Sequence, residues 1–124
     1  MRVFHLTTGA EWTAAQRAGS YTVSTRGRTL AQEGYIHCAA EHQVEGVRER
    51  YFTGVADLVL LEVETDLLGS PWRTEQVDGA DQSFPHVYGP IDLDAVVAVR
   101  PLESELTPTD RRAAPPRRRS PRTG

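Results

Sequence analysis

The chain has 124 residues, a net charge of −3 and a single cysteine, Cys38, so an internal disulfide is excluded. All basic side chains are arginines, because the sequence contains no lysine, and this excludes a lysine Schiff base and a phosphate-loop lysine. Residues 1–102 hold 8 arginines against 14 acidic residues, a net charge of −6, which argues against a broad basic face for nucleic acid. No apolar run is long enough for a membrane span and no signal-peptide pattern is visible, so we expect a soluble cytoplasmic protein.

Hydrophobic alternation and helix-capping signals predict short strands and helices. Thr8 and Glu11 have the spacing of a capping box, and Gly34 is suited to ending a helical turn. The predicted elements are, in chain order, a strand at 3–7, a helix from Thr8 to Gly19, a strand at 21–23, a polar turn at 24–28, a helical turn at 29–33, a helix at 41–52, strands at 57–64 and 72–77, a turn or mobile loop at 78–81, an extended segment at 84–90 and a strand at 95–101.

Two of these elements are expected to form the core. In the helix at 41–52, Val44, Val47 and Tyr51 recur at helical spacing and predict a buried stripe. The four apolar residues from Leu58 to Leu61 indicate a strand buried on both faces, and therefore a central strand. The strand-rich pattern with two or three short helices predicts an α+β fold rather than a regular alternation of strands and helices.

The composition changes near the end of the chain. Residues 1–102 predict one globular domain, whereas residues 103–124 are rich in proline and arginine and lose large apolar side chains after Leu106. Such a segment cannot bury enough surface to offset its ordering entropy, so we expect a disordered tail. The positive charge of Arg117–Arg119 is suited to contact with nucleic acid or an anionic membrane, but a tail that is solvated and makes no such contact is the favoured interpretation. The pattern specifies no oligomeric state.

The segment from Phe84 to Pro90 is the most informative stretch of the sequence. Its two prolines fix the backbone dihedral φ and favour extended geometry, in which alternate side chains share a face. Phe84, His86 and Tyr88 are therefore expected to point the same way. A titratable ring between two aromatic rings on a stiff backbone is typical of a pocket wall, although an exposed histidine on a strand edge is the alternative.

A second segment, from Tyr35 to Cys38, has similar character. Strand alternation places Tyr35 and His37 on one face and Ile36 and Cys38 in the core. With His5 in the first strand, three of the four histidines lie beside residues that are expected to be buried. This indicates a shared polar cleft, with purely structural histidines as the alternative.

The residues offer little support for two other chemistries. His5, His37 and His86 would make a zinc-like set with Glu75 or Asp81, but no close pair of ligands would nucleate it, so no metal site is predicted. Cys38 as a nucleophile would need exposure and a neighbouring base, whereas strand alternation makes it a core residue.

The order and spacing of several segments resemble a bacterial family, domain of unknown function 952. The resemblance covers residues 1–102 and rests on the segments 3–7, 34–38, 57–63 and above all 84–90, a Phe-Pro-His-x-Tyr-Gly-Pro element. The family is similar in fold to ADP-ribosyltransferases, which implies a small α+β domain with a split mixed or antiparallel sheet and two or three short helices. One departure is Ala39, where family members usually carry serine.

The resemblance also implies a nucleotide pocket. Enzymes of the ADP-ribosyltransferase superfamily consume NAD, so NAD or an ADP-ribose-like nucleotide is the implied ligand, as a substrate rather than a resident cofactor. The implied catalytic residues are His5, matching a first-strand histidine, and Glu75, a carboxylate that would stabilise an oxocarbenium-like ribose. A non-catalytic binding or interaction module on the same fold is the alternative. The implied ligand-binding residues are Tyr35, Phe84 and Tyr88 as stacking rings and His37 and His86 as phosphate or ribose contacts.

Overall fold

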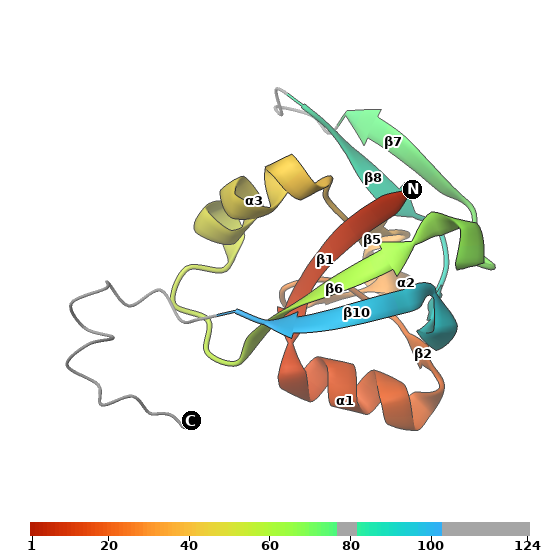
Figure 1. Ribbon diagram of the computed structural model, residues 1–124, viewed down its shortest axis with the longest axis horizontal. Helices are drawn as coiled ribbons and strands as arrows, with labels where there is room; N and C mark the ends of the chain where they lie inside the picture. The colour runs from red at the N-terminus through yellow and green to blue at the C-terminus, as the bar shows by residue number, and fades with distance from the viewer. Residues whose placement is uncertain (77–81, 103–124) are drawn as a thin grey trace.

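The computed structural model describes residues 1–76 and 82–102, and two three-stranded antiparallel sheets form its centre (Figure 1). The first sheet has the order β1 (Arg2–Thr8), β6 (Leu58–Glu64), β10 (Val96–Pro101), and the second has the order β5 (Ile36–His37), β8 (Ser83–Val87), β7 (Trp72–Gln76). Two short pairs complete the strands, β2 (Ser20–Tyr21) with β9 (Ile91–Asp92) and β3 (Val23–Thr25) with β4 (Arg28–Thr29). The helices are α1 (Gly9–Ala18), α2 (Leu30–Glu33) and α3 (Val44–Tyr51), with 3-10 turns η1 (Glu41–Gln43), η2 (Thr65–Leu67) and η3 (Leu93–Ala95).

This arrangement confirms the α+β prediction, with mostly antiparallel sheets and few, short helices. The loop expected at 78–81 and the tail expected at 103–124 lie outside the described residues. Within residues 1–76 and 82–102, no helix is long and apolar enough to cross a membrane.

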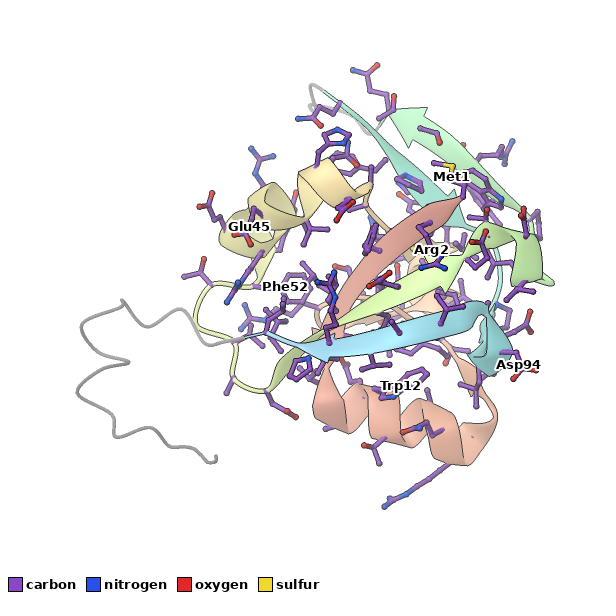
Figure 2. The ribbon with its side chains drawn as sticks, viewed as in Figure 1. Met1, Arg2, Trp12, Glu45, Phe52 and Asp94 are labelled. Carbon is purple, nitrogen blue, oxygen red and sulfur yellow. The ribbon has the colours of Figure 1, made fainter. Side chains whose placement is uncertain are left out.

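Strand β6 is central in the first sheet, as its run of apolar residues predicts. Its side chains alternate between two apolar clusters, so Leu61 packs on the face covered by α1 and Leu60 packs on the face covered by α3. Trp12 of α1 joins the first cluster and Phe52, just after α3, joins the second (Figure 2). The sheet is therefore covered on both faces.

Local signals fix the helix ends where the sequence predicts them. The Thr8 side chain accepts a hydrogen bond from the Glu11 amide and starts α1, which ends at Gly19 in a left-handed conformation. Thr29 and Gln32 form a reciprocal capping box that starts α2. Gly34 follows α2 with a φ of 90°, which a residue with a Cβ rarely adopts.

Two predicted elements differ from the structure. The polar turn expected at 24–28 is a hairpin of β3 and β4, in which Ser24 is buried and donates to the Tyr35 carbonyl. The helix expected at 41–52 begins as the 3-10 turn η1 and becomes α-helical only at Val44. Val44 and Val47 pack on the second apolar cluster, as predicted, but Tyr51, the last residue of α3, is 54 % exposed, and Phe52, which follows the helix, is buried.

The two sheets are joined at the outer edge of β1. Phe4 and Ala39 exchange both backbone hydrogen bonds, at 2.8 and 2.7 Å, so the segment after β5 continues the first sheet. The Cys38 amide also donates to the Pro85 carbonyl of β8, at 3.0 Å. One short segment, residues 36–39, therefore holds the second sheet against the first, and this junction positions the histidines.

Candidate functional site

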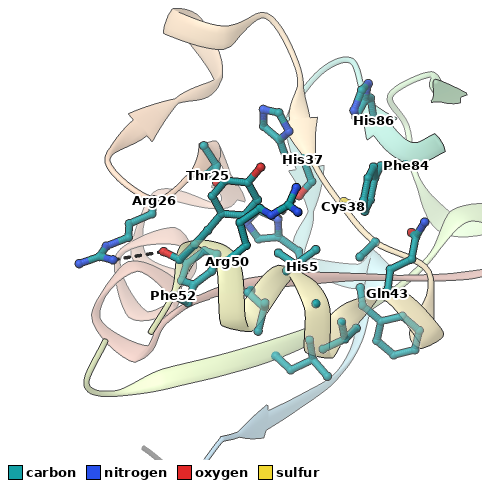
Figure 3. Close-up of a pocket in the computed structure, with 18 of the residues that line it drawn as sticks. His5, Thr25, Arg26, His37, Cys38, Gln43, Arg50, Phe52, Phe84 and His86 are labelled. Atoms are coloured by element: carbon teal, nitrogen blue, oxygen red, sulfur yellow. Dashed lines mark hydrogen bonds between the residues drawn. The ribbon is translucent and has the colours of Figure 1, made fainter. Parts of the chain in front are cut away.

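A pocket of about 680 Å³ brings together all four histidines, the three singled out from the sequence and His42 of η1 (Figure 3). His5 of β1, His37 of β5 and His86 of β8 all contribute to its lining, as does Phe84 of β8. The other walls come from α3, from the hairpin of β3 and β4, and from apolar side chains of β1 and β6. The structure therefore unites four of the seven residues singled out from the sequence in one pocket lining.

Strand pairing explains why His37 and His86 are neighbours. They lie opposite each other in the pairing of β5 with β8, while Ile36 lies opposite Val87. Because side chains alternate along a strand, Ile36 and Val87 go to the core and are fully buried. The two imidazole rings meet on the other face, with their centroids 5.5 Å apart and nearly perpendicular.

His5 has both ring nitrogens engaged within the protein. Its Nδ1 lies 2.5 Å from the His37 carbonyl oxygen, and its Nε2 lies 2.7 Å from the Tyr21 hydroxyl. Burial lowers the pKa of His5 to about 4, so the ring is neutral at physiological pH. With no nitrogen left for a ligand, His5 holds the His37 backbone in place, and these contacts favour an architectural role over the predicted catalytic one.

His86 is held from one side by a carboxylate. Its Nδ1 lies 2.9 Å from Glu75, which also accepts a hydrogen bond from the Tyr88 hydroxyl. The Tyr88 hydrogen bond, followed by that of His86, lowers the pKa of Glu75, so the carboxylate is charged and Nδ1 donates to it. The other nitrogen, Nε2, is buried and has no hydrogen-bond partner in the described part of the chain.

His37 has a carboxylate of its own. Its Nε2 lies 3.2 Å from Glu33 of α2, and the second Glu33 oxygen lies 2.9 Å from the Arg28 guanidinium. The His37 hydrogen bond is the main cause of the lowered pKa of Glu33. The His37 side chain is about one-third exposed, whereas that of His86 is 3 % exposed. His37 and His86 are therefore one accessible and one buried imidazole of the pocket lining, each beside a carboxylate.

Three predicted residues lie beside these histidines, outside the pocket lining. Tyr35 stacks on His86 with ring centroids 4.1 Å apart and also contacts the rings of His37 and Tyr88. Glu75 and Tyr88 form the hydrogen-bonded group behind His86, and the Arg73 guanidinium lies 4.8 Å from the centre of the Tyr88 ring. The predicted stacking rings thus stack on one another and on His86.

The pocket is less acidic than the rest of the protein. Its charged lining residues are Arg26, Arg50 and Glu33, although residues 1–102 carry a net charge of −6. Arg26 is anchored because it donates to the Tyr51 carbonyl at 3.1 Å, the dashed line in Figure 3. The two arginines, Glu33 and the apolar wall from α3 were not predicted as site residues. The spacing of Glu33 and His37, four residues apart, was the one signal available in the sequence.

The remaining chemistry of the pocket is limited. Among residues 1–76 and 82–102, no group of three or more His, Cys, Asp or Glu side chains is arranged to hold a metal ion. Cys38 lines the pocket but is 5 % exposed, which confirms its predicted place in the core. Burial raises the pKa of the Cys38 thiol to about 12, so it is not a thiolate nucleophile.

Comparisons with known proteins agree on the fold and supply no reaction. The sequence profile of the family described as "Protein of unknown function (DUF952)" matches residues 6–99. The crystal structure of protein CC0527 from Caulobacter crescentus is 31 % identical, covers 83 % of this chain and 87 % of its own, and superposes with a TM-score of 0.73. The solution NMR structure of the same protein gives 31 % identity and a TM-score of 0.68, with 82 % and 84 % covered. No curated protein matches the chain.

Proposed function

The chain belongs to DUF952, a family of unknown function, and we propose from its pocket that it binds a nucleotide such as NAD or ADP-ribose. The observation that carries this proposal is the pairing of arginines with apolar side chains in one pocket of an otherwise acidic protein. A nucleotide offers the matching groups, because its phosphates are anionic and its base is flat and largely apolar on both faces.

The placement of the two arginines supports a phosphate subsite at one end of the pocket. Arg26 follows β3 and Arg50 belongs to α3, so two separate elements contribute an arginine to the lining of the same pocket. Guanidinium groups form charge-assisted, often bidentate hydrogen bonds with phosphate oxygens. We therefore place the phosphates at Arg26 and Arg50 rather than at the buried ring of His86.

The apolar wall supports a base or nicotinamide subsite. Phe4, Leu6 and Leu60 of the first sheet pack with Val44 and Val47 of α3 in one apolar cluster, and these side chains form one part of the pocket lining. The pocket volume of about 680 Å³ lies within the usual range for sites that enclose a small molecule. His37, which is partly exposed beside this wall, is the group available to a ribose hydroxyl.

An ADP-ribosyltransferase-like reaction is the finer form of the same proposal, with NAD as the substrate. The division of the strands into two three-stranded sheets supports it. The roles of two residues change from those expected: His5 supports the pocket from behind, and Glu75 acts through His86 instead of facing the ligand. Because these contacts weaken the case for a transferase, binding is the primary proposal and turnover of NAD is secondary.

Titration calorimetry with ADP-ribose, NAD and AMP tests the proposal. We expect binding by the wild-type protein, and about tenfold weaker binding by Arg50→Gln, because one charge-assisted hydrogen bond to phosphate is lost. Arg17→Gln is the matched control, since Arg17 lies on α1, on the opposite face of the first sheet and outside the pocket. If none of the three ligands at millimolar concentration gives heat or a thermal shift, the alternative of an interaction module replaces this proposal.

A further inference from the structure

We propose that His37 and His86 form an acid–base pair that hydrolyses a five-membered cyclic phosphodiester, such as the 2′,3′-cyclic phosphate of a nucleotide. This activity rests on the proposed nucleotide site and adds a reaction to it. The carrying observation is that, of the four imidazoles that line the pocket, those of His37 and His86 lie 5.5 Å apart between ring centroids and each has its own carboxylate partner.

His86 has the arrangement of a general base. A neutral imidazole carries one proton, and the Glu75 carboxylate holds that proton on Nδ1. The lone pair is then on Nε2, which is buried and has no hydrogen-bond partner in residues 1–76 and 82–102. Glu75 approaches from β7, and the two ring nitrogens diverge, so Nε2 points away from Glu75. His37 lies opposite His86 on β5, and both residues line the pocket.

His37 has the arrangement of a general acid. Its Nε2 lies 3.2 Å from Glu33, which orients the ring, and its Nδ1 remains to donate a proton. The side chain is about one-third exposed, so it recovers a proton from solvent after each turnover. Glu33 and Glu75 are positioning residues, because each acts on the substrate only through its histidine.

The reaction consumes one water and needs no other reactant. His86 Nε2 takes a proton from water, and the water oxygen forms a bond to phosphorus. One ring P–O bond breaks, its electron pair leaves on the ribose oxygen, and His37 supplies the proton to that oxygen. The product is an acyclic phosphomonoester. His86 then releases a proton and His37 regains one, which restores both rings, while Arg26 and Arg50 hold the phosphoryl oxygens.

The rate acceleration that an acid–base pair can provide limits which class of phosphodiester it can hydrolyse. Positioned proton transfer accelerates a reaction by about 10²–10⁴-fold, which is too little for an unstrained phosphodiester. A five-membered cyclic phosphodiester is already reactive because ring strain is released when it opens. The acidic body also disfavours a long nucleic acid chain and leaves a small cyclic nucleotide as the fitting substrate.

Tyr35 controls access to His86. Its ring stacks on the His86 ring at 4.1 Å, and no hydrogen bond of its hydroxyl is found in the described residues. Because Nε2 is buried, a neighbouring side chain must shift before water reaches it, and the stacked, partly exposed Tyr35 ring is the side chain that we assign to this step.

The first experiment follows 2′,3′-cyclic AMP by ³¹P NMR at pH 5–9, with 3′,5′-cyclic AMP as the unstrained comparison. We expect hydrolysis of the 2′,3′-cyclic substrate with a bell-shaped dependence of kcat on pH, since one histidine must be neutral and the other protonated. His37→Asn and His86→Gln should each lower kcat at least 100-fold, and His86→Gln should leave the binding of ADP-ribose unchanged, because no part of that ligand is placed on His86. Hydrolysis that persists in both variants overturns the acid–base pair.

The second experiment examines the positioning residues. Glu33→Gln and Glu75→Gln should each lower kcat about tenfold, leave KM nearly unchanged and move one limb of the pH profile. Glu41→Gln is the matched control, because Glu41 is an exposed carboxylate of η1 outside the pocket lining. If all three variants had the same pH profile of kcat, the two carboxylates would not be positioning residues, and the assignment of His37 as the acid and His86 as the base would be wrong.

Two outcomes separate this proposal from the one on which it rests. Binding of ADP-ribose without hydrolysis above the buffer rate overturns the acid–base pair and leaves the nucleotide site intact; absence of both overturns both. Because a His86 variant can fail to fold, ¹⁵N NMR of the wild-type imidazoles at pH 8 gives an independent answer. We expect His86 with its proton on Nδ1, and a proton on Nε2 would overturn its role as the base.

Discussion

The two three-stranded sheets each bury a histidine at 2 % exposure, but the partners of the two rings differ. In the first sheet, His5 meets a backbone carbonyl and a tyrosine hydroxyl, and both of its nitrogens are satisfied. In the second sheet, His86 meets a charged carboxylate on one side and no partner on the other, within the described residues. The two rings are therefore equally buried, and they differ in whether both ring nitrogens have a hydrogen-bond partner.

The hydrogen-bond partners of a buried histidine indicate whether the ring serves the fold or a ligand. A ring with two uncharged partners stabilises the fold and is expensive to lose, because its removal orphans both partners. A buried nitrogen without a partner costs stability, so it persists where a ligand uses it. The same substitution at the two positions should therefore have opposite consequences for stability and for binding.

The largest expected effect is on folding, at His5. His5→Phe keeps a ring of similar shape but leaves the Tyr21 hydroxyl and the His37 carbonyl without their partners. We expect a loss of about 3 kcal/mol in the free energy of unfolding, from two buried polar groups. Urea denaturation measures it. A loss below about 1 kcal/mol would show that His5 is not the architectural residue of the pair.

The second effect is a dependence of stability on pH. The folded-state pKa of His5 is about 4, below its ordinary value of 6.5, so the unfolded chain binds a proton before the folded protein does. This contribution is fully present above pH 6.5 and is lost as the pH falls toward 4, by about 2 kcal/mol between pH 7 and pH 5. Urea denaturation at these two pH values should show the loss in the wild type.

The His5→Phe variant is the control for this pH effect and should show a flatter profile over the same range. The carboxylates with lowered pKa values, Glu33, Glu64 and Glu75, lose their stabilising effect only below their ordinary value of 4.5. Equal slopes in wild type and variant between pH 7 and pH 5 would contradict the assignment to His5.

The smallest effect on stability is expected at His86. His86→Phe removes the unpartnered Nε2 and also the hydrogen bond from Nδ1 to Glu75. The Glu75 carboxylate still accepts a hydrogen bond from the Tyr88 hydroxyl and still lies near the Arg73 guanidinium. The two changes oppose each other, so the free energy of unfolding should change by no more than about 1 kcal/mol. Thermal unfolding beside His5→Phe measures the contrast, and equal losses in the two variants would remove the distinction between the sheets.

Much of the fold could be predicted because its signals are local. The capping side chain of Thr8, the glycine after α2 and the apolar run of β6 each act within a few residues. The hairpin at 23–29 was missed because the burial of Ser24 depends on the distant Tyr35 carbonyl. The exposure of Tyr51 was missed because α3 ends at this residue, and the chain beyond the helix buries Phe52, which helical periodicity does not describe.

The site was predicted in part for the same reason. Strand alternation correctly put His37 opposite the Ile36 face, but it could not show that both His5 nitrogens are occupied. Pairing partners such as Tyr21 come from other elements, and their choice depends on the register between strands. The arginines were missed because Arg26 follows β3 and Arg50 lies on α3, which the chain brings together only in the folded protein.

The backbone junction between Phe4 and Ala39 has a consequence for amide hydrogen exchange. Two reciprocal hydrogen bonds tie the pocket wall to the outer strand of the first sheet, so local opening of the wall requires that strand to loosen as well. The Ala39 amide, although it lies two residues after His37 of the pocket, should exchange as slowly as amides of β6. A probe placed there reports global unfolding, whereas the exposed end of α3 reports the fluctuations that admit a ligand.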